Sequence, residues 1–177
     1  NDKLSLYELD SSIDFPLLNI EDMDLSKEND LNTFNNYIND VKGLIKKYGS
    51  AYVATYAPGY SCSATNSEDL EHKVISVNST CELEGSHAMQ VIGWDDNYEY
   101  KYCINGSLNE LWTSSCSSEN TVSGKGAWIL RNSWGEETND KYTYLTYDSR
   151  DVYFNFITDL DSSENRKWDY VYNKSVG

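Results

Sequence analysis

The chain has 177 residues, of which 39% are hydrophobic and 14% aromatic, which is enough to bury the core of one globular domain. Its formal net charge of −15 repels the phosphates of nucleic acids and the headgroups of anionic lipids, so we expect neither as a partner. No apolar run approaches the roughly 18 to 20 residues of a membrane-spanning helix, so we expect no membrane insertion.

The first segment, residues 1–29, is acidic and irregular, and we expect it to be an extended lead-in to the domain. Its start at Asn1 has neither an initiator methionine nor the layout of a signal peptide, so we expect a mature, processed or excised chain. Pro16 disfavours a helix in the apolar stretch 13–18, which is therefore expected to lie as a strand or strap against the core.

The second segment predicts the main helix of the chain. Asp30 is its expected N-cap, Lys46 and Lys47 favour its last turn, and Gly49 is expected to end it. Its apolar residues recur at three- and four-residue steps, which is the spacing of one helical face: Leu31, Phe34, Ile38, Val41, Ile45 and Tyr48.

Strand-like runs follow the helix, and long polar loops at 59–85 and 95–125 separate the first three of them. One helix followed by antiparallel-capable strands predicts an α+β fold with an antiparallel, barrel-like or strongly twisted sheet. We therefore assign residues 30–158 to one domain and residues 159–177 to a polar and aromatic tail. The runs are rich in β-branched and aromatic residues and span 51–56, 88–94, 127–132, 142–147 and 152–157.

The four cysteines, Cys62, Cys81, Cys103 and Cys116, form no C-x-x-C pair, which disfavours zinc-ribbon and thioredoxin-type sites. Their spacing favours two local disulfides, Cys62 with Cys81 and Cys103 with Cys116, each worth roughly 3 kcal/mol of stability. Disulfides imply a secreted or cell-surface protein, or the lumen of an oxidising compartment. Reduced, partly buried thiols in a cytosolic protein are the alternative.

The sequence indicates no metal site and no cofactor. Its acidic residues, such as Glu82, Glu84, Asp95 and Asp96, lack the spacing of an oxygen-ligand loop, and we interpret them as a solvated acidic face.

Imidazole chemistry in this chain has to use His72 or His87, its two histidines. His72 lies in the charged stretch 67–73 and is expected to be a solvated surface residue. His87 stands among small residues at the mouth of the 88–94 strand, where the sheet fixes its backbone and leaves its ring edge open to a cleft. On spacing alone, a structural histidine is the alternative.

Two motifs change the interpretation of His87. HAMQVIGW begins at His87, and WILRNSWG, further along the chain, contains Asn132. In this order they resemble the papain-like cysteine peptidases, and the resemblance extends over roughly residues 30–150. It implies that the chain is the right-hand, C-terminal half of the papain-like fold.

The resemblance also implies a role for each residue. His87 would stabilise a cysteine thiolate and later return a proton to the leaving amine, and Asn132 would orient its ring through a hydrogen bond. Trp134 would cover that bond and exclude water. Gly85 and Ala88 would border the substrate pocket. A turn-capping Asn132 and a core Trp134 are the structural alternatives.

None of the four cysteines has the neighbours of the family's nucleophile, which lies upstream on a helix. The oxyanion-hole glutamine that precedes it is missing as well. The chain is therefore expected to be inactive alone. Together with an N-terminal half of the domain, present on a missing segment or as a separate chain, it would form an endopeptidase that acts on peptide or protein substrates. The alternatives are a silent pseudopeptidase that binds or scaffolds, and an unrelated β-rich adhesion domain.

Overall fold

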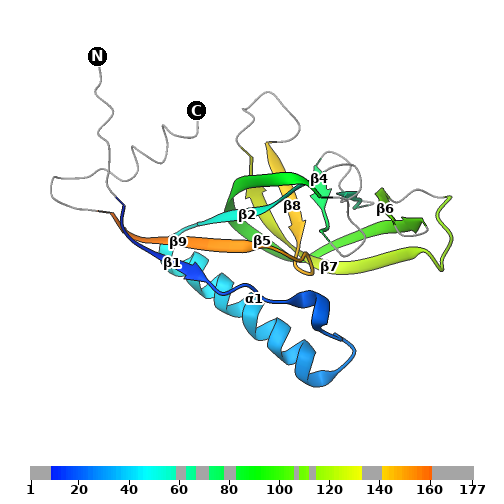
Figure 1. The fold of residues 1–177 in the computed structure, drawn as a ribbon, viewed down its shortest axis with the longest axis horizontal. Coiled ribbons are helices and arrows are strands. Elements are labelled where there is room, and N and C mark those ends of the chain that lie inside the picture. Colours follow the sequence, from blue (N-terminus) through cyan, green and yellow to red (C-terminus); the bar gives the residue numbers. More distant parts are fainter. Residues whose placement is uncertain are drawn as a thin grey trace, which may run out of the picture.

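In the computed structural model, the described residues form one α-helix that packs against one face of a nine-stranded sheet (Figure 1). No helix in the described part of the chain is long and apolar enough to cross a membrane. The structure describes residues 9–58, 63–66, 72–77, 83–105, 108–111, 115–132 and 141–160.

The strand order in the sheet is β1-β9-β2-β5-β7-β8-β4-β3, and β6 pairs with β5. The strand pairs are antiparallel except for β4 with β8, which is parallel. The elements are β1 (Leu9–Phe15), the 3-10 turn η1 (Ile20–Asp22), α1 (Glu28–Tyr48), β2 (Ala51–Pro58), β3 (Ser63–Ala64), β4 (Lys73–Ile75), β5 (Leu83–Asn105), β6 (Leu108–Leu111), β7 (Thr121–Arg131), β8 (Tyr142–Thr146) and β9 (Tyr153–Leu160).

The predicted α+β class with one main helix is confirmed, but the predicted antiparallel barrel is wrong. The sheet is mixed and open, because its outermost strands, β1 and β3, do not pair with each other among the described residues. β5 and β7 run on past the helix as a ribbon (Figure 1). The pairing of these strands has two register shifts, between Val91 and Gly93 and between Asp95 and Glu99, and such bulges bend a strand and increase its twist.

The ribbon occupies much of the stretch that the sequence assigned to a loop. Tyr98, Tyr100 and Tyr102 are buried, and the residues between them, Glu99 and Lys101, are exposed. This alternation is the period of a strand with one buried face. The interpretation as a loop was wrong because the charged residues hid the regular tyrosines.

Helix α1 begins earlier than expected. Its N-cap is Lys27, whose side chain makes no capping hydrogen bond, so the predicted N-cap at Asp30 is wrong. Asp30 lies in the first turn, where its carboxylate accepts a hydrogen bond from the N–H of Asp24 at 2.9 Å. The predicted end is confirmed, because Gly49 has a φ of 87° and donates its N–H to the carbonyl of Ile45 at 2.7 Å.

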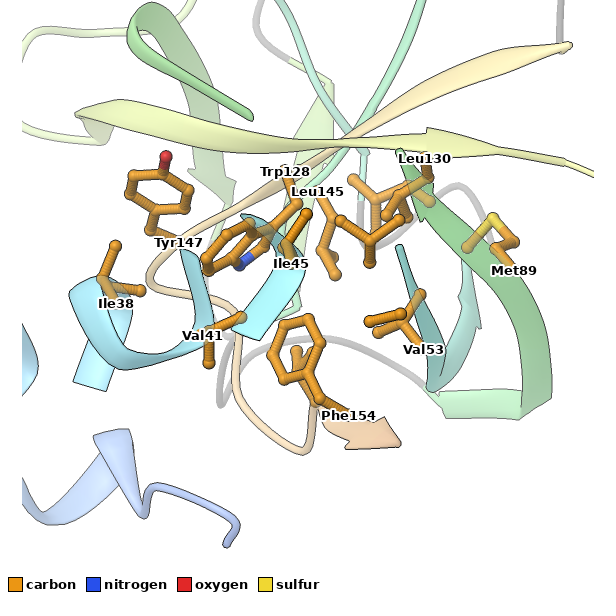
Figure 2. Packing of buried hydrophobic residues seen from close by; sticks show 14 of the residues in the cluster. Ile38, Val41, Ile45, Val53, Met89, Trp128, Leu130, Leu145, Tyr147 and Phe154 are labelled. Carbon is orange, nitrogen blue, oxygen red and sulfur yellow. The ribbon is translucent and has the colours of Figure 1, made fainter. Parts of the chain in front are cut away.

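The core lies between α1 and the sheet. Ile38, Val41 and Ile45 of the helix are buried with Trp128 of β7, Phe154 of β9 and other apolar residues of the sheet (Figure 2). The expected strap in the lead-in is strand β1, which pairs with β9. Phe15 of β1 contacts the ring of Tyr37 with a centroid distance of 5.2 Å, so this strand also packs on α1.

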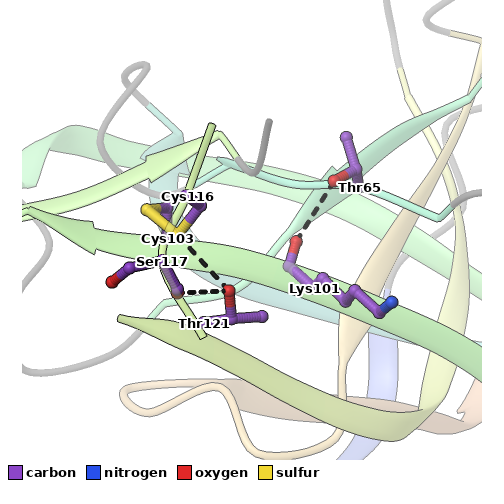
Figure 3. The surroundings of a disulfide bond; sticks show 6 residues. All are labelled: Thr65, Lys101, Cys103, Cys116, Ser117 and Thr121. Carbon is purple, nitrogen blue, oxygen red and sulfur yellow. Dashed lines mark hydrogen bonds between the residues drawn. A yellow bond between two sulfur atoms is a disulfide. The ribbon is translucent and has the colours of Figure 1, made fainter. Parts of the chain in front are cut away.

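The ribbon carries one of the two predicted disulfides. Cys103 of β5 is bonded to Cys116, and the Thr121 hydroxyl donates to the carbonyl of Ser117 at 2.9 Å beside it (Figure 3). The prediction for this pair is confirmed. Cys62 and Cys81 lie outside the described residues, as does the predicted tail beyond residue 160.

Candidate active site

His87 lies on β5, directly opposite Thr55 of β2 in the antiparallel ladder. Because side chains alternate along a strand, His87 shares a face with Met89 and Val91. Both of these residues are buried in the core that α1 covers, whereas His87 is half-buried. The ring therefore lies at the edge of the apolar core on this face of the sheet.

Asn132 reaches the same place from β7. The strand ends at Arg131, and the N–H of Asn132 continues its ladder by donating to the carbonyl of Lys141 at 2.9 Å. Leu130 is paired with Val91, and Asn132 lies two residues further along. The side chain of Asn132 is thus on the His87 face, and it is 9% exposed.

The ring and the carboxamide are within hydrogen-bonding distance, with Nε2 of His87 2.9 Å from Oδ1 of Asn132. A carboxamide oxygen only accepts, so Nε2–H is the donor, and in the neutral ring Nδ1 then carries the lone pair. The contact is partly buried, which strengthens it relative to one in water. The expected proximity is observed, and the catalytic roles of the two residues stay predictions.

Rigid packing holds the two strands that carry this pair. Val53, Val91 and Leu130, which flank it on the same face, are all 0% exposed. Displacing any of their backbones would open the core, so the positions of His87 and Asn132 are fixed by the fold.

The other predicted site residues are less well defined. Trp134 lies outside the described residues. Gly85 lies in β5, and Ala88 is exposed and, by alternation, points to the face opposite that of His87. Their assignment to a substrate pocket stays a prediction.

His72 is not the solvated residue that its charged surroundings predicted. It is half-buried, and its ring packs edge-on against Tyr144 at a centroid distance of 5.6 Å. The charged stretch gave the wrong prediction of exposure because His72 directly precedes β4, a strand whose Val74 and Ile75 are buried.

Asp96, one of the residues assigned to a solvated acidic face, contributes to the packing of α1. Asp96 contacts Lys42 of the helix and accepts a hydrogen bond from the Tyr147 hydroxyl at 2.9 Å. Burial opposes ionisation of this carboxyl, but the hydrogen bonds from Lys42 and Tyr147 prevail, and its pKa lies below the ordinary value. In the described ranges, no group of three or more histidine, cysteine, aspartate or glutamate side chains could hold a metal ion.

The sequence interpretation missed Thr55. Its side chain is 3% exposed, and its Oγ1 is buried without a hydrogen-bond partner. One signal was available, because Thr55 follows Ala51 and Val53 at the period of the buried face of a strand, where a hydroxyl is unusual.

No family model and no curated protein matches the chain. Among solved structures, it is similar to the clostridial cysteine protease Cwp84 after propeptide cleavage, with 21% identity and a TM-score of 0.46 over 70% of this chain. It is also similar to the cysteine protease and lectin-like domains of Cwp84, a surface layer associated protein of Clostridium difficile, with 22% identity and a TM-score of 0.43 over 71% of this chain. The chain covers only 27% and 24% of those two structures.

Proposed function

We propose that the chain is the C-terminal, histidine- and asparagine-bearing part of a papain-like cysteine endopeptidase, corresponding to the right-hand half of that fold. The observation that carries the proposal is the 2.9 Å contact between Nε2 of His87 and Oδ1 of Asn132. Both residues come from the motifs that resemble the family, and two different strands bring them together. A pair placed by chance would not be expected to share a face and a hydrogen bond.

The geometry suits thiol chemistry. With Nε2 bound to Asn132, Nδ1 is the nitrogen left to face a sulfur atom. An imidazolium there lowers the pKa of a thiol from its ordinary value of about 8.5 and yields the thiolate nucleophile. The thiolate attacks the peptide carbonyl carbon, His87 protonates the leaving amine, and water then hydrolyses the thioester with His87 as the base.

The nucleophile comes from polypeptide outside this chain. Cys103 and Cys116 are joined in a disulfide, so neither offers a thiol. Cys62 and Cys81 lack the sequence neighbours of the family's nucleophile. The partner is therefore an N-terminal half of the peptidase domain, which supplies a cysteine close to Nδ1, and the substrate is a peptide or protein that borders Gly85 and Ala88.

An extracytoplasmic location accompanies this function. The Cys103–Cys116 disulfide supports a secreted or cell-surface enzyme, because such bonds persist in oxidising surroundings. The net charge of −15 argues against nucleic acid as a partner.

Reconstitution tests the proposal. The chain is mixed with a first-half polypeptide that has a cysteine next to an aromatic residue at a helix start, and an epoxide that alkylates activated thiols is added. We expect one adduct by mass spectrometry and cleavage of a peptide substrate. His87→Ala should slow both by about 10²-fold or more, because the general acid-base group is lost.

His72→Gln is the matched control, since it removes the other histidine and leaves the site intact. Labelling that is equally fast in the His87→Ala and His72→Gln variants would refute the enzyme assignment. Complex formation without labelling or cleavage would favour the silent pseudopeptidase.

A further inference from the structure

The sheet face opposite α1 is exposed over β9, β2 and β5, three neighbouring strands (Figure 1). Side chains alternate along each strand, and the core residues Val53, Met89 and Phe154 share the face that α1 covers. The residues between them therefore point away from the helix. We call this surface the outer face, and its residues are Tyr52 and Ala54 of β2, Gln90 of β5, and Tyr153, Asn155 and Ile157 of β9.

The outer face exposes large side chains to solvent. Tyr52 is 47% exposed, Tyr153 38% and Ile157 40%. They belong to one continuous surface, because Tyr52 is opposite Asn155 and Ala54 is opposite Tyr153 in the antiparallel β2–β9 ladder. A sheet that faces water on one side ordinarily carries polar residues there. Exposed tyrosines beside an apolar side chain are instead typical of a protein interface.

Charged residues lie at the margins of the outer face. One cross-strand row runs through Asp14, Asn155, Tyr52, Gln90 and Arg131, on five neighbouring strands. Its two charged residues are the first and the last, on β1 and β7, although 24% of the chain is charged. An uncharged centre that contains tyrosines, with a charged rim, is the composition of protein–protein interfaces.

The margin at Asp14 also orders the outer face. The Asp14 carboxylate accepts a hydrogen bond from Nδ2 of Asn155 at 2.6 Å and another from the Tyr153 hydroxyl. Two side chains of the face are thereby held in place before a partner binds, which reduces the conformational entropy lost on association.

Charge and position indicate which partner covers the outer face. Two copies of this chain would each bring a net charge of −15, and their repulsion disfavours a dimer. Ala54 of the outer face is opposite Ala88, which directly follows His87 in β5. A polypeptide that supplies a sulfur atom to His87 is therefore brought to the end of β2 and β5 where the outer face begins.

We propose that the outer face is the docking surface for the N-terminal half of the peptidase, which covers it with an uncharged, largely apolar surface. Tyr52 lies at the centre of the contact, and Tyr153 and Ile157 flank it. The contact supplies affinity, so the partner's cysteine is held beside His87 without having to provide affinity itself. The inference rests on the proposed function, from which it takes the partner.

Binding of the full chain to the first-half polypeptide of the reconstitution, measured by isothermal titration calorimetry, tests the inference. Tyr52→Lys places a charge at the centre of the outer face and should weaken binding by about 30-fold or more, the loss typical of a central interface residue. Leu31→Lys is the matched control, because it adds the same charge at a side chain that is 41% exposed and lies on α1. It should leave the affinity nearly unchanged.

Equal affinities of Tyr52→Lys and Leu31→Lys would overturn the inference. A dimer of the chain alone that Tyr52→Lys dissociates in sedimentation experiments would overturn it too, because a second copy would then be the occupant. Amide spectra show whether each variant is folded, and Ile157→Lys is the replacement if Tyr52→Lys is not.

Labelling of the partner's thiol tests the proposed function separately in the same mixtures. Binding that depends on Tyr52 without any labelling would support the docking surface and argue against the enzyme. Labelling together with equal affinities of the two variants would refute the docking surface alone.

Discussion

Gly126→Ala is the substitution whose effect follows most directly from the structure. Gly126 has a φ of 96°, a region that residues with a Cβ rarely adopt, and it lies in β7 opposite the register shift between Asp95 and Glu99. A Cβ at this position would lie 2.4 Å from Cδ2 of Tyr147. Alanine therefore meets both backbone strain and a collision with a ring.

The magnitude combines three contributions. A left-handed backbone costs a residue with a Cβ about 1 to 2 kcal/mol. Overpacking against the Tyr147 ring adds about 1 to 3 kcal/mol. If the ring moves, its hydrogen bond to Asp96 is lost, at about 1.5 to 3 kcal/mol for a bond to a charged group. Since these costs overlap when the ring relaxes, we expect a loss of about 3 to 5 kcal/mol, a large share of the stability of a typical domain.

Equilibrium unfolding in urea measures this loss. Gly93→Ala is the matched control in the same sheet, because its Cβ would meet only Cδ1 of Ile129 at 3.8 Å, an ordinary contact. We expect Gly93→Ala to cost about 1 kcal/mol or less. If Gly126→Ala unfolds at the same urea concentration as Gly93→Ala, the conformation assigned to this segment of β7 is wrong.

Three further predictions concern α1, the disulfide and pH. Gly43→Ala should stabilise the chain by about 1 kcal/mol in urea unfolding, because its Cβ would meet nothing within 4 Å and alanine favours a helix, and a loss would contradict this. Cys103→Ser should cost about 3 kcal/mol, and an equal loss on reduction of the wild type would verify the bond as its source. The lowered pKa of Asp96 stabilises the fold above the ordinary carboxyl pKa of about 3.9 and ceases to do so as pH falls through the folded value. The cost of Asp96→Asn should therefore shrink on acidification, and a pH-independent cost would argue against the contacts with Lys42 and Tyr147.

Elements with a strong apolar period could be predicted from the sequence. The helix face from Phe34 to Tyr48 packs on the core as the pattern predicted, although its first residue, Leu31, is exposed. The strand beginning at Ala51 also follows where expected, after Gly49. The β5–β7 ribbon was missed because its buried residues are tyrosines, which alternate with charged residues and make a loop and a strand look alike. The pairing of β4 with β8 in parallel could not be predicted either, because nothing local in a three-residue strand determines its partner.

Some residues of the candidate site could likewise be predicted from the sequence, and others could not. His87 and Asn132 could be found from the sequence, because each lies in a motif of several residues with a chemical meaning. Thr55 could be recognised only as a hydroxyl on a buried strand face, because its position opposite His87 depends on the register of β2 against β5, which emerges only when the sheet is assembled. The prediction for His72 was wrong. Its charged neighbours predicted an exposed side chain, but its ring packs against Tyr144.

The polar groups of the site lie at the end of an otherwise apolar face. Val53, Met89 and Leu130 belong to the core, and one step further along the same face the side chains become Thr55, His87 and Asn132. Each polar group that is buried or half-buried costs desolvation, and apolar residues of similar size would pack there without it. Stability of the fold does not explain this change from apolar to polar side chains. Departures of this kind from a consistent pattern are expected at functional sites. Under the proposed function, this end of the face, at Nδ1 of His87, is where a partner's thiol would be sought.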